Sequence, residues 1–281
     1  MSELPVNGAH HSGRRGGKSS PRRLPILALV LWAAAAGAAE RVFEFGPAPA
    51  GYTGARRLRY GFTASNTGKA PLREARLRVA APAPHTAAQW CARLACTHEA
   101  ERVADTNGNQ VLLFRLDGLP PYGQRVISID AEVFISDRPD PTDPADPAHR
   151  TARAAFDRVV GTLVYDGYHQ RDRGAAWALE HGRGDCTEFA AAFVALCRAG
   201  GVPARRVSGY RCSRARVLSP FEFHTWAEFH DGRAWRPVDP LYGRFPAPPA
   251  GAIAFILHAH AGPPAALFRC EGENLAVSMN E

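Results

Sequence analysis

Lysine is almost absent from this chain of 281 residues. Among its 34 basic side chains only Lys18 and Lys69 are lysines, and the others are arginines. A coding bias toward arginine and alanine explains this better than any mechanism does, because composition alone rarely encodes chemistry. The length permits one large domain or two modest ones, each with an ample hydrophobic core.

Excess charge is also small once the amino terminus is set aside. The formal net charge is +7, but residues 1–39 alone carry five basic side chains against the single acidic Glu3. The rest of the chain is therefore only slightly basic and offers little support for binding to nucleic acid. We expect no nucleic-acid partner.

Long hydrophobic runs are missing except for one near the amino terminus. Residues 24–36 are apolar, follow a basic stretch and precede small residues that end at Ala39. This order is typical of an export signal cleaved near Ala38 or Ala39, and the run is short for a membrane span. No cysteine lies nearby to accept a lipid. We expect residues 1–39 to be a signal peptide, or alternatively an uncleaved membrane anchor, and the protein to be periplasmic or secreted.

Helical signals are lacking between residues 40 and 136. This part contains short segments in which apolar and polar residues alternate, separated by turn residues such as Asn107-Gly108. The clearest segments are 74–79, 111–116 and 125–134. Several short strands without helices between them predict a β-sandwich-like module over residues 40–136.

A proline-rich segment separates this module from the rest of the chain. Residues 137–147, of sequence DRPDPTDPADP, predict a stiff linker. Helical patterns begin after it, at 151–160 and 174–180, and the tail from 252 to 278 has the pattern of strands that pack back on this part. We therefore expect a second domain over residues 148–281.

Cys186 stands at the boundary between a glycine-rich segment and a helical run. It follows the sequence GRGD at residues 182–185, and residues 187–198 form a helix-favouring run ended by two glycines and a proline. A cysteine in the first turn of a helix faces unpaired backbone N–H groups and the positive end of the helix dipole, which favour the thiolate. We therefore expect a nucleophile. A buried structural thiol or half of a disulfide is the alternative.

His224 and Asp239 are expected to meet across a hairpin. Two predicted strands, 223–229 and 233–238, are joined by a two-residue Asp-Gly turn. With such a turn, residues equally far from it lie opposite each other, which places His224 opposite Asp239 on one face. A carboxylate there holds the imidazole tautomer and leaves the other ring nitrogen for a thiol.

Further blocks of sequence surround these three residues. In chain order they are Gly184-Asp185-Cys186-Thr187-Glu188-Phe189-Ala190, Gly201-Val202-Pro203-Ala204-Arg205, Gly209-Tyr210, His224-Thr225-Trp226-Ala227-Glu228, Trp235 and Val238-Asp239-Pro240. Together they cover residues 150–245 and resemble the core of the transglutaminase-like superfamily, in the order found in that family. The resemblance implies an α+β fold, with a papain-like transglutaminase core preceded by the β-sandwich-like module. It also implies that Cys186 is the nucleophile, His224 the general base and acid, and Asp239 the residue that orients His224.

The chemistry that this resemblance implies is acyl transfer at an amide of a protein or peptide substrate. A thioester on the cysteine would be resolved by an amine or by water, so a cysteine peptidase or amidase is an alternative. A non-catalytic binding scaffold of the same fold is another. The arylamine N-acetyltransferases share similar triad spacing, but the residues before Cys186 fit them poorly. No cofactor and no metal is implied, and the oligomeric state stays open.

Trp226 and Glu228 are candidates for lining the substrate cleft. They alternate along the strand onto the face of His224. Packing beside the hairpin is an equal alternative for Trp226. His258 and His260 also share a face, but no third ligand is evident, so surface or core histidines are a simpler interpretation than a metal site.

An oxidising compartment permits disulfides among the other cysteines. Cys91 and Cys96 are close enough in sequence to be joined if the chain turns there, and Cys212 and Cys270 could form a second bridge. Cys197 falls on the apolar face of the helix after Cys186 and is predicted to be buried.

Overall fold

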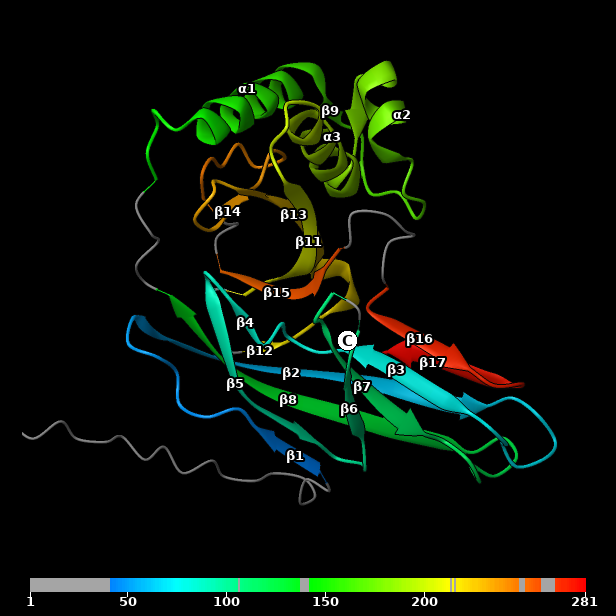
Figure 1. The fold of residues 1–281 in the computed structure, drawn as a ribbon. Coiled ribbons are helices and arrows are strands. Elements are labelled where there is room, and N and C mark those ends of the chain that lie inside the picture. The colour runs from blue at the N-terminus through cyan, green and yellow to red at the C-terminus, as the bar shows by residue number, and fades with distance from the viewer. Residues whose placement is uncertain are drawn as a thin grey trace, which may run out of the picture. The chain divides into compact units, whose positions relative to one another are not determined.

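The computed structural model describes residues 41–105, 107–136, 142–212, 214, 216–247, 251–258 and 266–281, which belong to one compact unit. The predicted signal peptide at residues 1–39, part of the predicted linker and His260 lie outside the described residues. No helix in the described ranges is long and apolar enough to cross a membrane. Figure 1 shows the order of the elements.

The first half of the chain forms strands. They are β1 (Arg41–Glu44), β2 (Tyr52–Asn66), β3 (Arg76–Ala80), β4 (His85–Thr86), β5 (Gln89–Cys96), β6 (Glu101–Ala104), β7 (Gln110–Arg115) and β8 (Gln124–Ser136). β3, β7 and β8 confirm the three predicted segments to within a few residues. Alternation along β2 decides which side chains are buried. Leu58 and Tyr60 are buried in the core, whereas Arg57 and Arg59 are exposed.

These strands form two sheets that share one hydrophobic cluster. The seven-stranded sheet has the order β1-β5-β8-β2-β12, with β4 also on β5 and β17 also on β2. The four-stranded sheet has the order β16-β3-β7-β6. Buried residues of both sheets, such as Tyr60 and Phe62 in β2 and Leu77 in β3, belong to the same cluster. A core between two sheets thus explains why this half of the sequence needs no helices.

Three strands of these sheets come from the second half of the chain, which corrects the predicted boundary at residue 148. They are β12 (Arg216–Val217), β16 (Phe268–Glu271) and β17 (Leu275–Met279). β17 runs antiparallel to β2 and β16 antiparallel to β3. The tail is strand-rich as predicted, but its last two strands complete the first two sheets, whose edges would otherwise carry unpaired backbone groups.

The helices and a further sheet make up the rest of the second half. The elements are α1 (Pro147–Thr162), β9 (Val164–Tyr165), α2 (Gly174–His181), β10 (Arg183–Gly184), α3 (Cys186–Ala199), β11 (Ala204–Arg211), η1 (Pro220–Glu222), β13 (Phe223–His230), β14 (Trp235–Val238) and β15 (Ala252–Leu257). The sheet has the order β14-β13-β11-β15. The predicted linker ends where Pro147 opens α1, because the Asp146 side chain accepts hydrogen bonds from the N–H groups of Ala148 and His149.

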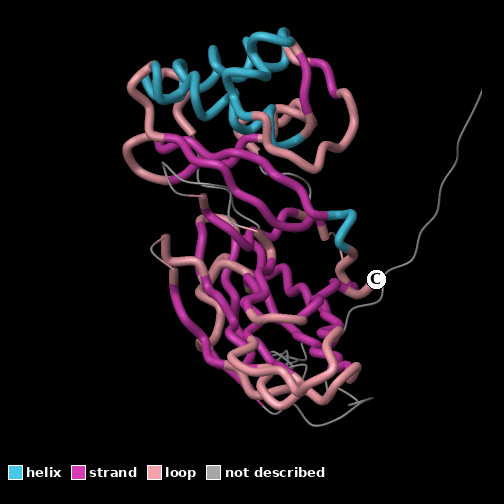
Figure 2. The backbone as a smooth tube through the Cα atoms, turned by 90° about the vertical axis from the view of Figure 1, so that its right-hand side faces the viewer, coloured by secondary structure: helices cyan, strands magenta, loops and turns pink. Residues whose placement is uncertain are grey.

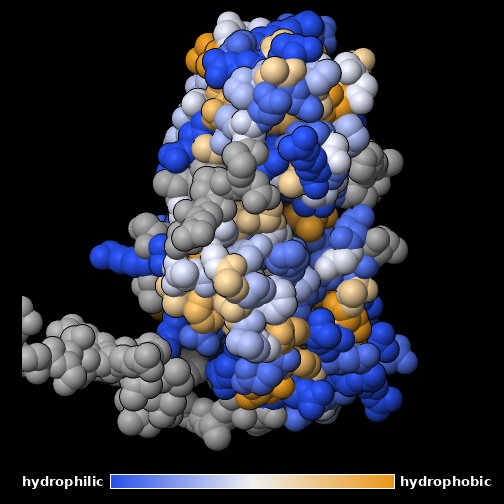
Figure 3. Space-filling model, turned by 60° about the vertical axis from the view of Figure 1, so that its left-hand side comes forward, coloured by the Kyte–Doolittle hydropathy of each residue, from blue (hydrophilic) through white to orange (hydrophobic). Residues whose placement is uncertain are grey.

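The four-stranded sheet β14-β13-β11-β15 has helices on one face and strands on the other (Figures 1 and 2). On the helical face, Phe193 of α3 and Phe156 of α1 pack with Phe229 of β13. On the opposite face, Tyr210 of β11 and Phe255 of β15 join the large cluster of the first two sheets. α3 therefore packs against both α1 and the sheet. On the face seen in Figure 3, hydrophobic side chains occur only in small, separate patches.

Candidate active site

α3 begins with a complete capping box, which fixes Cys186 as the first residue of the helix. The Asp185 side chain accepts a hydrogen bond from the Thr187 N–H at 2.8 Å, and Glu188 accepts one from the Asp185 N–H at 2.9 Å. Gly184 is required just before the cap, because a Cβ there would lie 2.4 Å from the Cβ of Glu188. The predicted position of Cys186 in the first turn of a helix is thus confirmed.

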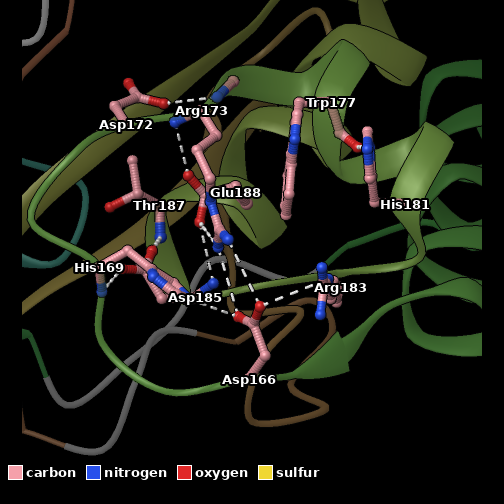
Figure 4. A network of polar contacts seen from close by, with 11 residues as sticks. Asp166, His169, Asp172, Arg173, Trp177, His181, Arg183, Asp185, Thr187 and Glu188 are labelled. Carbon is pink, nitrogen blue, oxygen red and sulfur yellow. Dashed lines mark hydrogen bonds and ion pairs between the residues drawn. The ribbon is translucent and has the colours of Figure 1, made fainter.

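Arg173 ties the loop before α2 to this helix start (Figure 4). Its guanidinium and its backbone N–H both bind the carboxylate of Glu188, at 3.1 and 2.8 Å. It also bonds Asp166 and lies over the ring of Trp177, 3.9 Å from the centroid. The Glu188 side chain is fully buried, so Arg173 compensates a charge that would otherwise be costly there.

A second contact fastens the same loop to the cap. The His169 N–H donates to the other carboxylate oxygen of Asp185 at 3.0 Å, and the His169 ring bonds Asp166 at 2.9 Å. Asp185 therefore caps α3 and anchors the loop at once. Glu188 has the same double role, in addition to the favourable interaction of a carboxylate in the first helical turn with the helix dipole.

The β13–β14 hairpin differs from the predicted one by two residues. His230 pairs with Trp235, so the connection contains four residues and not two. Asp231 causes this, because its side chain accepts hydrogen bonds from the N–H groups of Arg233 and Ala234 and closes a wider loop. Extended by one residue, the observed register places Asp239 opposite Trp226.

His224 and Asp239 nevertheless meet, because a shift of two residues keeps a side chain on the same face of a strand. The Nε2 atom of His224 lies 3.0 Å from the Oδ2 atom of Asp239. Both side chains are buried, and the other oxygen of Asp239 accepts the Tyr242 N–H at 3.4 Å. The imidazole is thus bound through Nε2, which leaves Nδ1 for another partner.

Two aromatic rings fix the plane of the His224 imidazole. Trp226 is stacked against it at 6.2 Å between centroids, and Tyr242 meets it edge-on at 5.3 Å. The Tyr242 ring is exposed on its other side, where the guanidinium of Arg211 lies 4.1 Å from its centroid. The ring of His224 can therefore not turn without moving either neighbour.

Cys186 and His224 line one cavity of about 1320 Å³. Its walls come from the loop 165–172, the start of α3, the strands β11 and β13, the segment 220–222 and the C-terminal strands β16 and β17. The cavity is large enough for several residues of a peptide, since it exceeds the usual volume of a small-molecule site. Asp239 lies behind His224 and is not among the described residues that line it.

The protonation of Cys186 is the reverse of the sequence prediction. Burial, together with smaller contributions from the carboxylates of Asp185 and Asp239, raises the pKa of the thiol to about 11. Hydrogen bonds from the Thr225 backbone and the Thr187 side chain lower the pKa only in part. The helix dipole does not prevail, because burial of the sulfur disfavours the thiolate and the Asp185 carboxylate adds to this effect. A neutral thiol is therefore the resting form.

The two cleft candidates from the sequence do not line this cavity, as far as the described residues show. Trp226 is buried in a small cluster with Val207 and Ala254, on the face directed away from α3. Glu228 is buried against Arg205, with 2.6 Å between their charged groups. Burial raises the pKa of Glu228, and Arg205 opposes this. Trp226 acts on His224 by packing, and Glu228 belongs to the frame of the sheet.

A polar group that the sequence did not predict lines the same cavity as Cys186. The Ser208 hydroxyl is 2.9 Å from the hydroxyl of Thr225 and 2.7 Å from Nε2 of His258. Burial lowers the pKa of His258 to about 4, aided by the nearby Arg206. His258 is thus a neutral, hydrogen-bonded residue of the cavity wall. Only pairing between β11, β13 and β15 brings these residues together, so no local pattern could have identified them.

The cysteines form no disulfide in the described part of the chain, so both predicted bridges are wrong. Cys91 and Cys96 lie in the same extended strand, five residues apart, which separates them by about 16 Å at about 3.3 Å per residue. Cys212 is buried, whereas Cys270 is exposed on β16. Cys197 is buried as predicted, and burial raises the pKa of its thiol to about 12.

Nothing in the described ranges resembles a metal site. No group of three or more His, Cys, Asp or Glu side chains there could hold an ion. The carboxylates that line the cavity have other partners: Asp172 bonds Arg206 at 2.6 Å and Glu222 bonds Arg216 at 2.5 Å.

Comparison with known proteins gives a match to a family model over part of the chain and a likeness to a solved structure. Residues 139–240 match the family model described as the transglutaminase-like superfamily. A solved structure of a candidate cysteine protease from Cytophaga hutchinsonii is 18% identical, with a TM-score of 0.49, covering 80% of this chain and 92% of its own. No curated protein sequence matches significantly.

Proposed function

We propose, from the premise that residues 139–240 belong to the transglutaminase-like superfamily, that this protein is an acyl-transferring cysteine enzyme. Its substrate would be an amide of a protein or peptide, with Cys186 as nucleophile. His224 would act as general base and acid, and Asp239 would orient it. The supporting observation is the 3.0 Å contact between His224 Nε2 and Asp239 Oδ2, in a cavity lined by both Cys186 and His224.

The raised pKa of Cys186 determines how the first step would proceed. A neutral thiol attacks poorly, so the proton would pass to Nδ1 of His224 as the sulfur bonds to the amide carbonyl carbon. The positive charge on the imidazolium would then be stabilised by the buried carboxylate of Asp239. His224 would return this proton to the departing amine, and the acyl group would remain on sulfur as a thioester.

The oxyanion formed in this step needs hydrogen-bond donors. The first N–H groups of an α-helix have no partner within the helix, so the backbone N–H of Cys186 is the expected donor. A second molecule would then attack the thioester. An amine would give transamidation, and water would give hydrolysis, with His224 taking the proton in either case and the thiol leaving with it.

One experiment separates these outcomes. Glutamine-containing peptides and a biotin-labelled primary amine are offered together, and the products are read by mass spectrometry. Gain of the amine indicates transamidation, a mass increase of about 1 Da indicates deamidation, and shorter peptides indicate a peptidase. All three products are expected to disappear in Cys186→Ala and to persist in Cys270→Ala, which removes an exposed thiol away from the cavity.

An unreactive Cys186 would instead favour a non-catalytic binding scaffold. Alkylation of Cys186 in the wild type, followed by peptide mapping, decides this independently of any substrate. Localisation is tested in the producing cell: we propose an exported protein, so the mature chain is expected in the periplasm or medium and to begin near Ala39. Retention of residues 1–39 in the membrane fraction would indicate an anchor.

A further inference from the structure

Arg211 differs from the other charged residues of the cavity because no carboxylate neutralises it in the described part of the chain. The other arginine that lines the cavity, Arg206, is bonded to Asp172 at 2.6 Å. Glu222 lines the cavity near the end of β11 but is bonded to Arg216 at 2.5 Å. The Nε atom of Arg211 is buried and has no hydrogen-bond partner among the residues that the structure describes. A buried donor without a partner is costly, so the site gains stability from a ligand that accepts its hydrogen bond.

The place of Arg211 is fixed by the strand register. Gly209 pairs with His224, and Arg211 lies two residues further along β11, on the same face. The guanidinium rests on the ring of Tyr242, which itself meets the ring of His224. One aromatic ring thus separates the unpaired charge from the general base. These two contacts, of 4.1 and 5.3 Å to the centroid of Tyr242, place the guanidinium at most about 9 Å from the imidazole, which an extended peptide spans with two or three residues at about 3.4 Å each.

The chemistry of the ligand follows from the guanidinium and its surroundings. A planar guanidinium binds a carboxylate or a phosphate through two parallel hydrogen bonds. The cavity wall also carries Asp172, Asp185 and Glu222, so it is not strongly positive and would repel a dianionic phosphate. A singly charged carboxylate therefore fits this site better.

We propose that Arg211 is a carboxylate-binding residue that selects peptides carrying a carboxylate two or three residues from the reacting amide. The carboxylate would be either the α-carboxylate of a chain end or an acidic side chain. This inference rests on the proposed function, because it specifies which substrates the same cavity would bind. The inference can be tested by binding alone, without catalytic turnover.

Equilibrium binding to the Cys186→Ala variant tests the proposal without catalysis. Three unlabelled peptides with acetylated amino termini are compared by isothermal titration calorimetry: Gln-Ala-Gly as the free acid, Gln-Ala-Gly as its amide, and Gln-Ala-Asp as its amide. At low salt the free acid, the Asp peptide or both are expected to bind about tenfold more tightly than the neutral peptide. Which of the two gains affinity identifies the source of the carboxylate.

The preference is expected to vanish when Arg211→Gln is added, while the affinity for the neutral peptide stays the same. Arg158→Gln, which removes an exposed arginine from α1, is the charge-matched control and should leave the preference intact. If Arg211→Gln does not fold, Arg211→Lys replaces it and should reduce the preference to about threefold, because lysine lacks the two-pronged geometry.

Equal binding of all three peptides by the Cys186→Ala variant would overturn the proposal. So would a preference that survives Arg211→Gln, or no measurable binding of any peptide. If wild-type protein shows no acyl transfer but the preference exists and depends on Arg211, the proposed function fails and the carboxylate site stands.

Discussion

His224 and Asp239 are in contact although their strands are paired two residues away from the register that brings them directly opposite. The contact is diagonal across the hairpin, and it survives because side chains of a strand alternate with a period of two. What the hairpin preserves is therefore the face on which both groups lie. For the proposed catalysis this tolerance would matter, since the contact with Asp239 binds Nε2 of the imidazole and leaves Nδ1 available.

Replacement of Asp239 by asparagine should lower the rate of acylation by about a hundredfold to ten-thousandfold. The amide can donate a hydrogen to Nε2, which favours the tautomer with its proton on Nδ1 and removes the base. Stopped-flow measurement of thioester formation checks this. Asp157→Asn on the exposed face of α1 is the control and should acylate at the wild-type rate. An Asp239→Asn variant with a wild-type rate would exclude the orienting role.

The raised pKa of Cys186 predicts a distinct pH dependence of alkylation in the absence of His224. Because the neutral thiol is favoured up to about pH 11, the rate of reaction with iodoacetamide in His224→Ala should rise about tenfold per pH unit between pH 7 and pH 10. The wild type should react faster near pH 7, because His224 accepts the proton. Both are measured in a Cys270→Ala background, which removes the exposed thiol. A plateau below pH 9 in His224→Ala would show that burial does not control this thiol.

The first turn of α3 could be predicted from the sequence because every interaction that defines it is local. Asp185, Glu188 and the glycine at 184 lie within five residues of one another, and a capping box depends only on such spacing. The hairpin was predicted less well for a related reason. The Asp231-Gly232 pair suggests a two-residue turn, but the side chain of Asp231 stabilises a wider loop through contacts that the dipeptide does not encode.

Features that depend on distant segments could not be predicted. The pairing of β17 with β2 joins segments that are far apart in the sequence. Ser208 meets His258 only because β15 lies beside β11. The protonation state of Cys186 also depends on distant segments. The helix dipole is a local property, but the burial that raises the pKa of the thiol is produced by the walls of the cavity.

Arg173 is expected to stabilise the start of α3 more than any other arginine of its loop. Arg173→Gln leaves the fully buried Glu188 without its counter-ion, so the melting temperature should fall by several degrees. Arg183→Gln is the matched control: Arg183 approaches Asp166 only at 3.8 Å and is largely exposed, so its loss should change the melting temperature little. Calorimetry of both variants measures the difference. An equal change in melting temperature for the two variants would mean that the ion pair between Arg173 and Glu188 does not stabilise the fold.

Cys197 should contribute a pH-dependent part of the stability, since burial raises the pKa of its thiol from 9.0 to about 12. A raised pKa favours the folded state while the thiol is neutral, so this contribution is complete below pH 9 and is lost as the pH rises toward 12. The Cys197→Ala variant lacks this pH-dependent contribution to stability. The free energy of unfolding, measured in urea from pH 8 to pH 10.5, should therefore fall less steeply in this variant than in the wild type, by about 1.4 kcal/mol per pH unit above pH 9. Cys270→Ala removes an exposed thiol and should follow the wild-type curve. Parallel curves for Cys197→Ala and the wild type would indicate that the thiol reaches solvent before the protein unfolds.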